Sequence, residues 1–509
     1  MRREGLLFSV SAADSFAAAE RLLGCGAVPA AIPEFVVARR LLFSLILFQI
    51  LSHLFWLSPA AHSGQLAIPW MMNRGKTLFA DIWEQHAPGS SWLGAAAQAL
   101  LPTVDPALLI KVLNTALVVA LTLLIYHLAT RLSGKTSAGA LAALYWVWWE
   151  PVYGNIMLYF DTLLALCVLL ALIVYYHAEG RPTHKQIALT GVLMGAATLF
   201  KQHAWLAVAL VGFWLLFTGN RKTLLVYALA ALVLPALQWL ALAAGGLSDS
   251  YIFWNWTFNL QGFMDGVPLD GDLFRKLLLG NLLVFPFALL ALRRDKRRLL
   301  LLPLVWLAAL TVLYPRFGEI HGMGQLPFAA VMSGMVLAWT LPQITDPRQW
   351  QVSQTVFAGL ALGIGVGWLW TGAATYIPTS LGPGATLGYD EFDEVVAQLL
   401  LASEAEETLF VLPETDSTPQ LHARTGLLPP GTWIKGWRWY FRPDFVLPAL
   451  IGEWAKQAPT WVVVFPDMIP AGEPGISPLL AIVQRDYQLQ FTVEGIFGHG
   501  PAQVYRSPA

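Results

Sequence analysis

Charge and cysteine are scarce in this sequence of 509 residues. Only 12% of the residues are charged and 56% are hydrophobic, which does not suit a soluble globular protein. The two cysteines, Cys25 and Cys167, provide neither a disulfide framework nor a CxxC metal site, so redox chemistry is excluded. Because the net charge is -1 and no Lys/Arg run is suited to following the phosphates of a duplex, the chain does not fit a basic nucleic-acid-binding protein.

Long apolar segments recur along the chain and predict an all-α polytopic membrane domain. A bilayer core takes about 20 residues of helix, and the N-terminal residues lack the features of a cleaved signal peptide, so the first segment is expected to remain as an anchor. About eleven transmembrane helices are expected at 41–57, 107–130, 137–152, 156–176, 187–200, 204–219, 223–245, 276–292, 299–314, 326–341 and 354–375.

The positions of Lys and Arg predict the topology. With a cytoplasmic N-terminus and eleven crossings, most basic residues before position 377 lie in cytoplasmic loops. Joining the two segments around Lys201 into one helix would place the basic run at 293–298 outside, so we keep two crossings. The predicted parts are a cytoplasmic segment (1–40), a transmembrane domain (41–376) with a long first external loop (58–106), and an extracytoplasmic domain (377–509). Compact loops favour the plasma (inner) membrane.

Residues 377–509 have a different composition and predict a small α/β domain. Acidic residues outnumber basic ones there, and an acidic segment after an odd number of crossings lies outside. Strand-like runs at 408–413, 460–467 and 488–495 alternate with helix-like runs at 390–401 and 447–457. Four aromatic residues of this domain either stack on an acceptor sugar or dock the domain onto the membrane part: Trp433, Trp437, Trp439 and Tyr440.

Polar residues gather at the external ends of the predicted helices. They are Asp81, Glu84 and His86 in the first external loop, Asp161 at the start of the fourth crossing, Lys201, Gln202 and His203 in an outer turn, and Arg316, Glu319 and His321 after the ninth crossing. A charge at the centre of a bilayer costs about 2.5 to 3.5 kcal/mol on insertion scales. Several such residues at one face therefore predict a polar cavity.

Each of these residues also has a structural interpretation. Asp81 could be a solvated loop acid, and Asp161 could cap its helix. Lys201 and Arg316 could extend to lipid headgroups, as basic residues at helix ends commonly do. The histidines could stack on rings, and their spacing matches no metal-binding motif, so we predict neither a metal site nor a cofactor.

An acid beside several cations within a membrane suits a lipid-phosphate substrate. The cations hold the phosphate, the lipid chain lies between helices, and a carboxylate accepts a proton from an incoming hydroxyl. Because a phosphodiester is already a good leaving group, catalysis needs mainly positioning and charge stabilisation.

Three short motifs resemble a known family. The loop contains G-x-x-x-x-x-D-x-W-x-x-H-x-P from Gly75 to Pro88, Asp161 opens a helix, and G-x-x-x-x-x-K runs from Gly195 to Lys201. Together with the turn at 315–321, they resemble the GT-C glycosyltransferases over residues 40–342. The most similar group is family 39 with the protein O-mannosyltransferases, which includes the lipid A aminoarabinose and rhizobial lipopolysaccharide transferases.

The resemblance implies transfer of a monosaccharide, with inversion, from a polyprenyl-phosphate donor to a lipid, glycan or protein acceptor outside the cell. It implies that Asp81 accepts the acceptor proton with Glu84 as a helper, that Lys201 and Arg316 hold the phosphate, and that Asp161 orients Lys201 or a sugar hydroxyl. The remaining polar residues of the cavity are expected to bind substrate.

One departure from the family keeps alternatives open. Many relatives carry another acid about a dozen residues before the loop glycine, but no carboxylate lies between Pro59 and Lys76 here. Either Asp81 takes that role or activity has been lost. A transporter or flippase for a lipid-linked saccharide is the other alternative, although paired repeats and interrupted helices are not evident.

Overall fold

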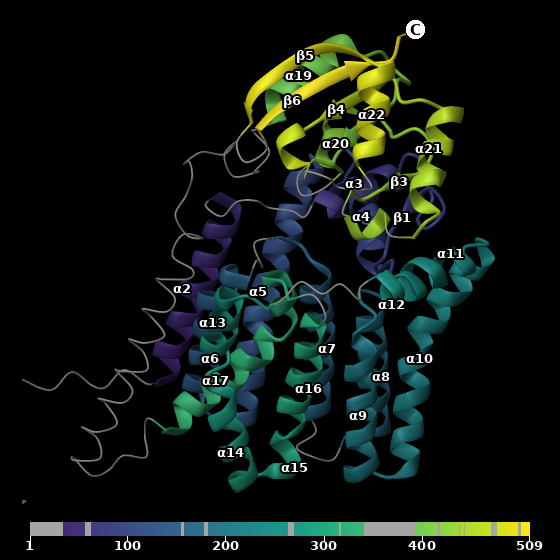
Figure 1. Cartoon of the computed structure of the whole chain (residues 1–509). Helices are drawn as coiled ribbons and strands as arrows, with labels where there is room; N and C mark the ends of the chain where they lie inside the picture. The colour runs from purple at the N-terminus through teal and green to yellow at the C-terminus, as the bar shows by residue number, and fades with distance from the viewer. Residues whose placement is uncertain are drawn as a thin grey trace, which may run out of the picture.

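The computed structural model describes most of the chain as a helical bundle beneath a smaller α/β layer (Figure 1). The described residues are 34–55, 63–153, 157–177, 182–262, 269–314, 317–340, 392–414, 418–436, 438–441, 443–469, 476–496 and 500–508. The predicted cytoplasmic segment, apart from its last seven residues, and the predicted crossing at 354–375 lie outside these ranges.

The bundle consists mainly of apolar helices, most of which begin and end within about five residues of the predicted segments. They are α2 (Glu34–Phe55), α5 (Pro106–Ser133), α6 (Thr136–Trp149), α7 (Phe160–Tyr176), α8 (His184–Thr198), α9 (Ala204–Thr218), α10 (Arg221–Ala244), α13 (Gly271–Gly280), α14 (Val284–Arg294), α15 (Lys296–Leu299), α16 (Leu301–Leu310) and α17 (Leu326–Thr340). Four stretches, 35–54, 106–133, 221–244 and 271–294, are long and apolar enough to cross a membrane. The chain is a membrane protein; the number of crossings remains a prediction.

One predicted separation between helices is present, and one predicted helix is divided into two. Helices α8 and α9 are separate, as expected, and the turn at 199–203 joins them. The segment at 276–292 is divided by a turn between α13 and α14. The Asn281 side chain donates to the Leu277 carbonyl at 2.8 Å and accepts from the Trp306 indole at 2.8 Å. Side-chain bonds of this kind compete with the backbone bonds of a helix.

Gly195, the glycine of the predicted lysine motif, lies where α8 packs against α10. A Cβ atom at this position would lie 2.3 Å from the carbonyl oxygen of Ala231. Small residues let membrane helices approach closely, so glycine here allows α8 to lie against α10 and sets the position of the turn that follows.

The long loop predicted at 58–106 contains regular secondary structure. It contains the helices α3 (Ser63–Met72) and α4 (Gly89–Leu100) and the short strand β1 (Ile82–Trp83). Further short elements lie near the same end of the bundle: η1 (Pro151–Tyr153), α11 (Ser248–Ile252), the π-helix η2 (Phe253–Thr257), α12 (Phe258–Gly262), η3 (Thr311–Leu313) and η4 (Glu319–Gly324).

The C-terminal part forms a four-stranded mixed sheet with helices, which confirms the expected strands. The sheet order is β2-β4-β6-β5, with β2 and β4 parallel and the remaining pairs antiparallel. The strands are β2 (Leu409–Leu412), β4 (Trp461–Val464), β5 (Gln488–Ile496) and β6 (Gly500–Arg506). The helical elements are α19 (Asp393–Ala402), α20 (Gln420–Thr425), η8 (Arg438–Phe441), α21 (Val446–Lys456), η9 (Pro466–Met468) and α22 (Ser477–Asp486). Strand β6 and helices α20 and α22 were not predicted.

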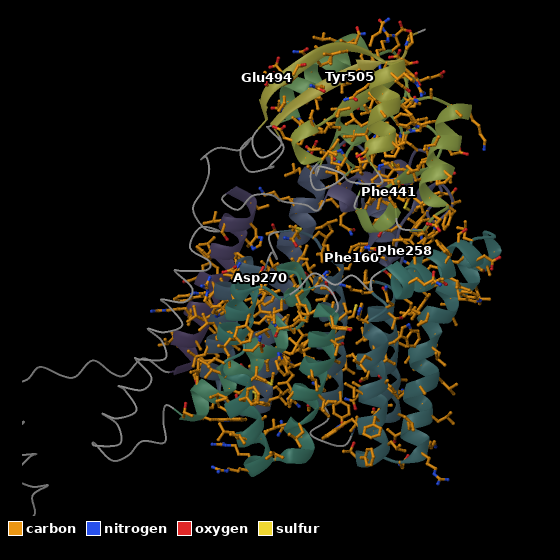
Figure 2. All side chains as sticks on the ribbon, viewed as in Figure 1. Phe160, Phe258, Asp270, Phe441, Glu494 and Tyr505 are labelled. Carbon is orange, nitrogen blue, oxygen red and sulfur yellow. The ribbon has the colours of Figure 1, made fainter. Side chains whose placement is uncertain are left out.

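The C-terminal part docks directly onto the loop at 58–106. Strand β3 (Trp433–Ile434) pairs in parallel with β1. Trp433 and Tyr440 are fully buried, and the ring centroids of Tyr440 and Phe258 are 5.2 Å apart. These two aromatic residues therefore dock the domain, whereas the side chains of Trp437 and Trp439 lie outside the described residues. In Figure 2, Phe258 and Phe441 lie near the level where the bundle meets the C-terminal part.

Candidate active site

The structure brings Asp161, Lys201 and His321 together from three separate segments. The Lys201 ammonium lies 2.8 Å from the Asp161 carboxylate and 3.2 Å from Nδ1 of His321. The Asp161 side chain is completely buried at the first turn of α7, and Lys201 is 4% exposed. The Asp161 carboxylate thus binds a lysine and a histidine, and that lysine does not extend to solvent or headgroups.

The turn at 199–203 presents Lys201 to this cluster and also holds the loop at 58–106. The N–H of Gly89 donates to the Leu199 carbonyl at 2.8 Å. A Cβ atom on Gly89 would lie 2.5 Å from that carbonyl oxygen, so only glycine permits the contact. The loop residues just before Gly89 are therefore held beside Lys201.

Two of those loop residues, Glu84 and His86, form a second buried polar group with Lys435 of the C-terminal part. The Lys435 ammonium lies 2.7 Å from the Glu84 carboxylate, whose other oxygen contacts Nδ1 of His86. Burial alone would raise the pKa of Glu84, but the charge of Lys435 and the hydrogen bonds with Lys435 and His86 hold it well below its usual value. Burial lowers the pKa of His86 to about 4, against the opposing effect of Glu84. Glu84 is consequently ionised and His86 neutral near pH 7.

His86 connects the two polar groups. Its ring stacks on Phe160 with the ring centroids 4.0 Å apart, and Phe160 directly precedes Asp161 in the chain. The charge of Lys201 also contributes to the lowered pKa of His86. The loop and the helix ends thus form one continuous site.

Asp81 occupies a different position from Glu84. In the extended chain at 81–84, alternate side chains face opposite sides, so Ile82 and Glu84 are buried whereas Asp81 and Trp83 are half-buried. The Asp81 carboxylate accepts a hydrogen bond from the Thr77 N–H at 2.7 Å. Among the described residues, no hydrogen bond or ion pair joins it to the Asp161 cluster.

The remaining predicted site residues are Gln202, His203, Arg316 and Glu319. Arg316 and the side chain of Glu319 lie outside the described residues. Gln202 donates to the Asn255 carbonyl at 3.3 Å, and His203 lines a small apolar pocket between α7, α9, α16 and α17. The pocket wall includes Leu164, Val168, Ala207, Val305, Ala308 and Phe328. An apolar space therefore adjoins the polar site.

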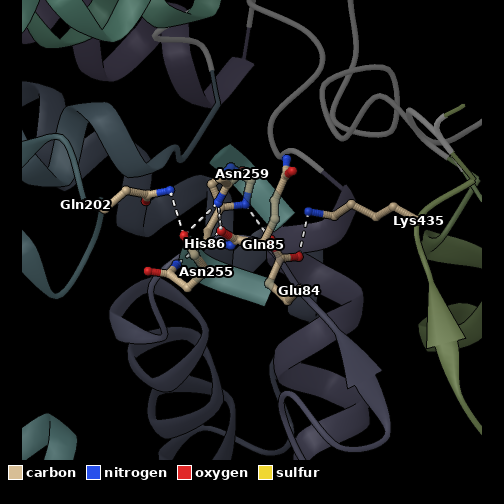
Figure 3. A network of polar contacts seen from close by, with 7 residues as sticks. All are labelled: Glu84, Gln85, His86, Gln202, Asn255, Asn259 and Lys435. Atoms are coloured by element: carbon tan, nitrogen blue, oxygen red, sulfur yellow. Dashed lines mark hydrogen bonds and ion pairs between the residues drawn. The ribbon is translucent and has the colours of Figure 1, made fainter. Parts of the chain in front are cut away.

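Sequence reasoning missed Lys435, Asn255 and Asn259, which all contact residues 84–86 (Figure 3). Both asparagines donate to the Gln85 carbonyl, at 3.1 and 2.8 Å. Two asparagines four residues apart in an aromatic helix were an available signal. The sequence around Lys435 contains no such signal, because only the pairing of β3 with β1 brings this lysine to the loop. Within the described ranges, no group of three or more His, Cys, Asp or Glu side chains is arranged to hold a metal ion.

Comparison with known proteins agrees with this architecture. Residues 85–241 match the family described as dolichyl-phosphate-mannose-protein mannosyltransferase. ArnT from Cupriavidus metallidurans, bound to undecaprenyl phosphate, is similar in structure, with a TM-score of 0.60 and 13% identity over 94% of this chain and 99% of that one. AglB, the oligosaccharyltransferase of Archaeoglobus fulgidus, in complex with an inhibitory peptide and a dolichol-phosphate, has a TM-score of 0.55 and 12% identity over 92% and 74%. No curated protein matches this chain in sequence.

These similarities define the fold of the protein. The chain has the fold of the GT-C membrane glycosyltransferases, which confirms the resemblance predicted from its motifs. At 12 to 13% identity the shared property is the fold, so the chemistry has to be argued from the residues of the site.

The neutral state of His86 predicts a pH dependence of stability. Unfolding returns its pKa from about 4 to its ordinary 6.5, so the unfolded chain binds more protons between these values and stability rises with pH across that window. We expect the unfolding temperature in detergent to rise from pH 4.5 to pH 6.5 and His86→Gln to flatten this rise. The exposed His184→Gln is the control, and an unchanged slope in His86→Gln would contradict the assignment.

Proposed function

We propose that the protein is a glycosyltransferase that moves a monosaccharide, with inversion, from a polyprenyl-phosphate donor to an acceptor hydroxyl. The observation that carries this proposal is the buried Asp161–Lys201–His321 cluster beside His86 and an apolar pocket. A lipid phosphate needs both environments, and the two adjoin here.

In this proposal Lys201 binds the donor phosphate. Its ammonium is buried, so its interaction with a phosphate oxygen is stronger than it would be in water. Asp161 keeps the ammonium in place before the donor arrives, and His321 lies within hydrogen-bond distance of it. The start of the polyprenyl chain enters at the apolar pocket beside His203, and the helices around this small pocket move apart to admit it. Arg316, in the segment just before η4, is a proposed second phosphate ligand.

The contacts favour His86, oriented by Glu84, as the proton acceptor in place of Asp81. An ionised carboxylate only accepts hydrogen bonds, so neutral His86 carries its proton on Nδ1, toward Glu84, and Nε2 is left as the basic nitrogen. The carboxylate also stabilises the imidazolium that forms, as in other carboxylate–histidine pairs. Asp81 instead holds the turn at 77–82, and Lys435 fixes Glu84.

The proposed reaction is a single displacement. The acceptor oxygen bonds to the anomeric carbon while the bond from that carbon to the phosphate oxygen breaks, and the hydroxyl proton passes to His86. The polyprenyl phosphate leaves with the electron pair of the broken bond and is stabilised by Lys201. Attack opposite the leaving group inverts the anomeric centre.

We place the site on the extracytoplasmic side of the plasma membrane. Glu84 contacts Lys435 of the C-terminal part, and Phe160, which precedes Asp161, lies at the end of the bundle that carries this part (Figure 2). The distribution of basic residues predicts that this end is outside. A lipid, glycan or protein acceptor would then approach between the C-terminal part and the bundle.

A transfer assay tests the proposal. Purified protein in nanodiscs is given radiolabelled undecaprenyl-phosphate sugars and a membrane extract as the acceptor source, and we expect release of free undecaprenyl phosphate. Lys201→Gln, which keeps a donor for Asp161 but removes the charge, is expected to lower turnover by about 10²- to 10³-fold. Exposed Lys185→Met at the start of α8 is the control. Donor that binds but stays intact would favour a transporter or an inactive relative.

The proton acceptor is tested separately. Glu84→Gln and His86→Gln are each expected to lower turnover by about 10²- to 10⁴-fold with little change in donor affinity. Asp81→Asn keeps an oxygen for the Thr77 N–H and is expected to retain most turnover. The opposite pattern, with turnover lost in Asp81→Asn and kept in Glu84→Gln, would return the role to Asp81.

A further inference from the structure

Two buried amide oxygens beside His86 have no partner within the part of the chain that the structure describes. They are Oδ1 of Asn255, whose side chain is completely buried, and Oε1 of Gln202. The amide nitrogens are already used: Asn255 donates to the Gln85 carbonyl at 3.1 Å and Gln202 to the Asn255 carbonyl at 3.3 Å. Because each nitrogen faces a carbonyl, the free atom of each amide is its oxygen, a hydrogen-bond acceptor.

A π-helix builds this arrangement. Asn255 lies in the middle of η2, where the N–H of Phe258 bonds to the Phe253 carbonyl, five residues back. The wider turn leaves the Asn255 carbonyl to accept two side-chain amides, from Gln202 and from Asn259 at 2.9 Å. Single π-turns occur frequently at functional sites. In Figure 3 the Asn255 amide oxygen lies on the side away from Gln85.

Unpaired acceptors in a buried site are costly unless a ligand supplies donors. We propose that Asn255 and Gln202 bind hydroxyl groups of the sugar on the donor lipid, an inference that rests on the proposed function. Gln202 directly follows Lys201 in the chain, so the sugar subsite adjoins the proposed phosphate subsite. In a polyprenyl-phosphate donor the sugar is bonded directly to the phosphate, so its hydroxyl groups would lie in this adjoining subsite and could donate to the two amide oxygens.

The local charges favour neutral hydroxyl groups over an amino group. Both nearby carboxylates are already ion-paired, Asp161 with Lys201 and Glu84 with Lys435. An ammonium group on the sugar would approach two cations without a free anion to pair with. The amide oxygens therefore match a polyhydroxylated neutral monosaccharide.

Binding measurements with matched lipids test the subsite. The probes are undecaprenyl phosphate and its mannose, glucose and 4-amino-arabinose conjugates, each bound to the full-length protein in nanodiscs. Wild-type protein is expected to bind at least one neutral conjugate more tightly than the bare lipid phosphate. Asn255→Leu should lose about 10- to 30-fold in affinity for that conjugate and leave the affinity for undecaprenyl phosphate nearly unchanged.

Asn259→Leu is the matched control, because Asn259 makes the same bond to the Gln85 carbonyl and a bond to Asn255. It should change the affinity for both lipids by the same factor. Gln202→Leu, at a half-buried position, should reproduce the selective loss and serves if Asn255→Leu does not fold.

Three results with the variants would overturn the inference. They are an equal loss of affinity for the conjugate and for bare undecaprenyl phosphate in Asn255→Leu and Gln202→Leu, no loss of affinity in either variant, or a loss of affinity confined to the amino-sugar conjugate. A wild-type protein that gains nothing from the sugar would also overturn it, while its binding of bare undecaprenyl phosphate would still support the proposed function. Failure to bind any of these lipids would instead reject both.

Discussion

The buried ion pair between Asp161 and Lys201 is the interaction on which the rest of the site depends. Taking two charges out of water is expensive, and a buried pair of this kind adds little to stability compared with apolar packing. Removing one partner, however, leaves an uncompensated charge inside the protein. The pair therefore fixes the start of α7 relative to the turn after α8, and His321 ties η4 to both. The charged donor that we propose would account for an ion pair inside an apolar bundle.

A second constraint comes from the C-terminal part, which completes the site instead of only covering it. Strand β3 pairs with β1, and the next residue, Lys435, reaches Glu84. Without this cation, burial would work against the ionised form of Glu84 and so against the Nδ1-protonated form of His86. The membrane bundle and the C-terminal part are thus mutually dependent, and an acceptor bound between them would be close to the proton acceptor.

Much of this architecture could be predicted from the sequence, because apolar length and charge placement act locally. Asp161, Lys201 and His321 were predicted to share a cavity, and the structure brings them into contact. Sequence reasoning ranked Asp81 above Glu84 as the proton acceptor, an order that the contacts of Glu84 with His86 and Lys435 do not favour. Their difference depends on which side of a two-residue strand each faces, and the strand is set by pairing with Lys435's segment about 350 residues away. Pairing between segments so far apart in the chain leaves no recognisable pattern in the sequence around Asp81 and Glu84.

The most direct measurement of the central claim is a structure of the protein in a lipid nanodisc with undecaprenyl phosphate. The account predicts phosphate density within hydrogen-bond distance of the Lys201 ammonium, with the first isoprene units in the pocket lined by His203 and Phe328. Phosphate bound at another face, or an Asp161–Lys201 pair with lipid density nowhere near it, would contradict the account.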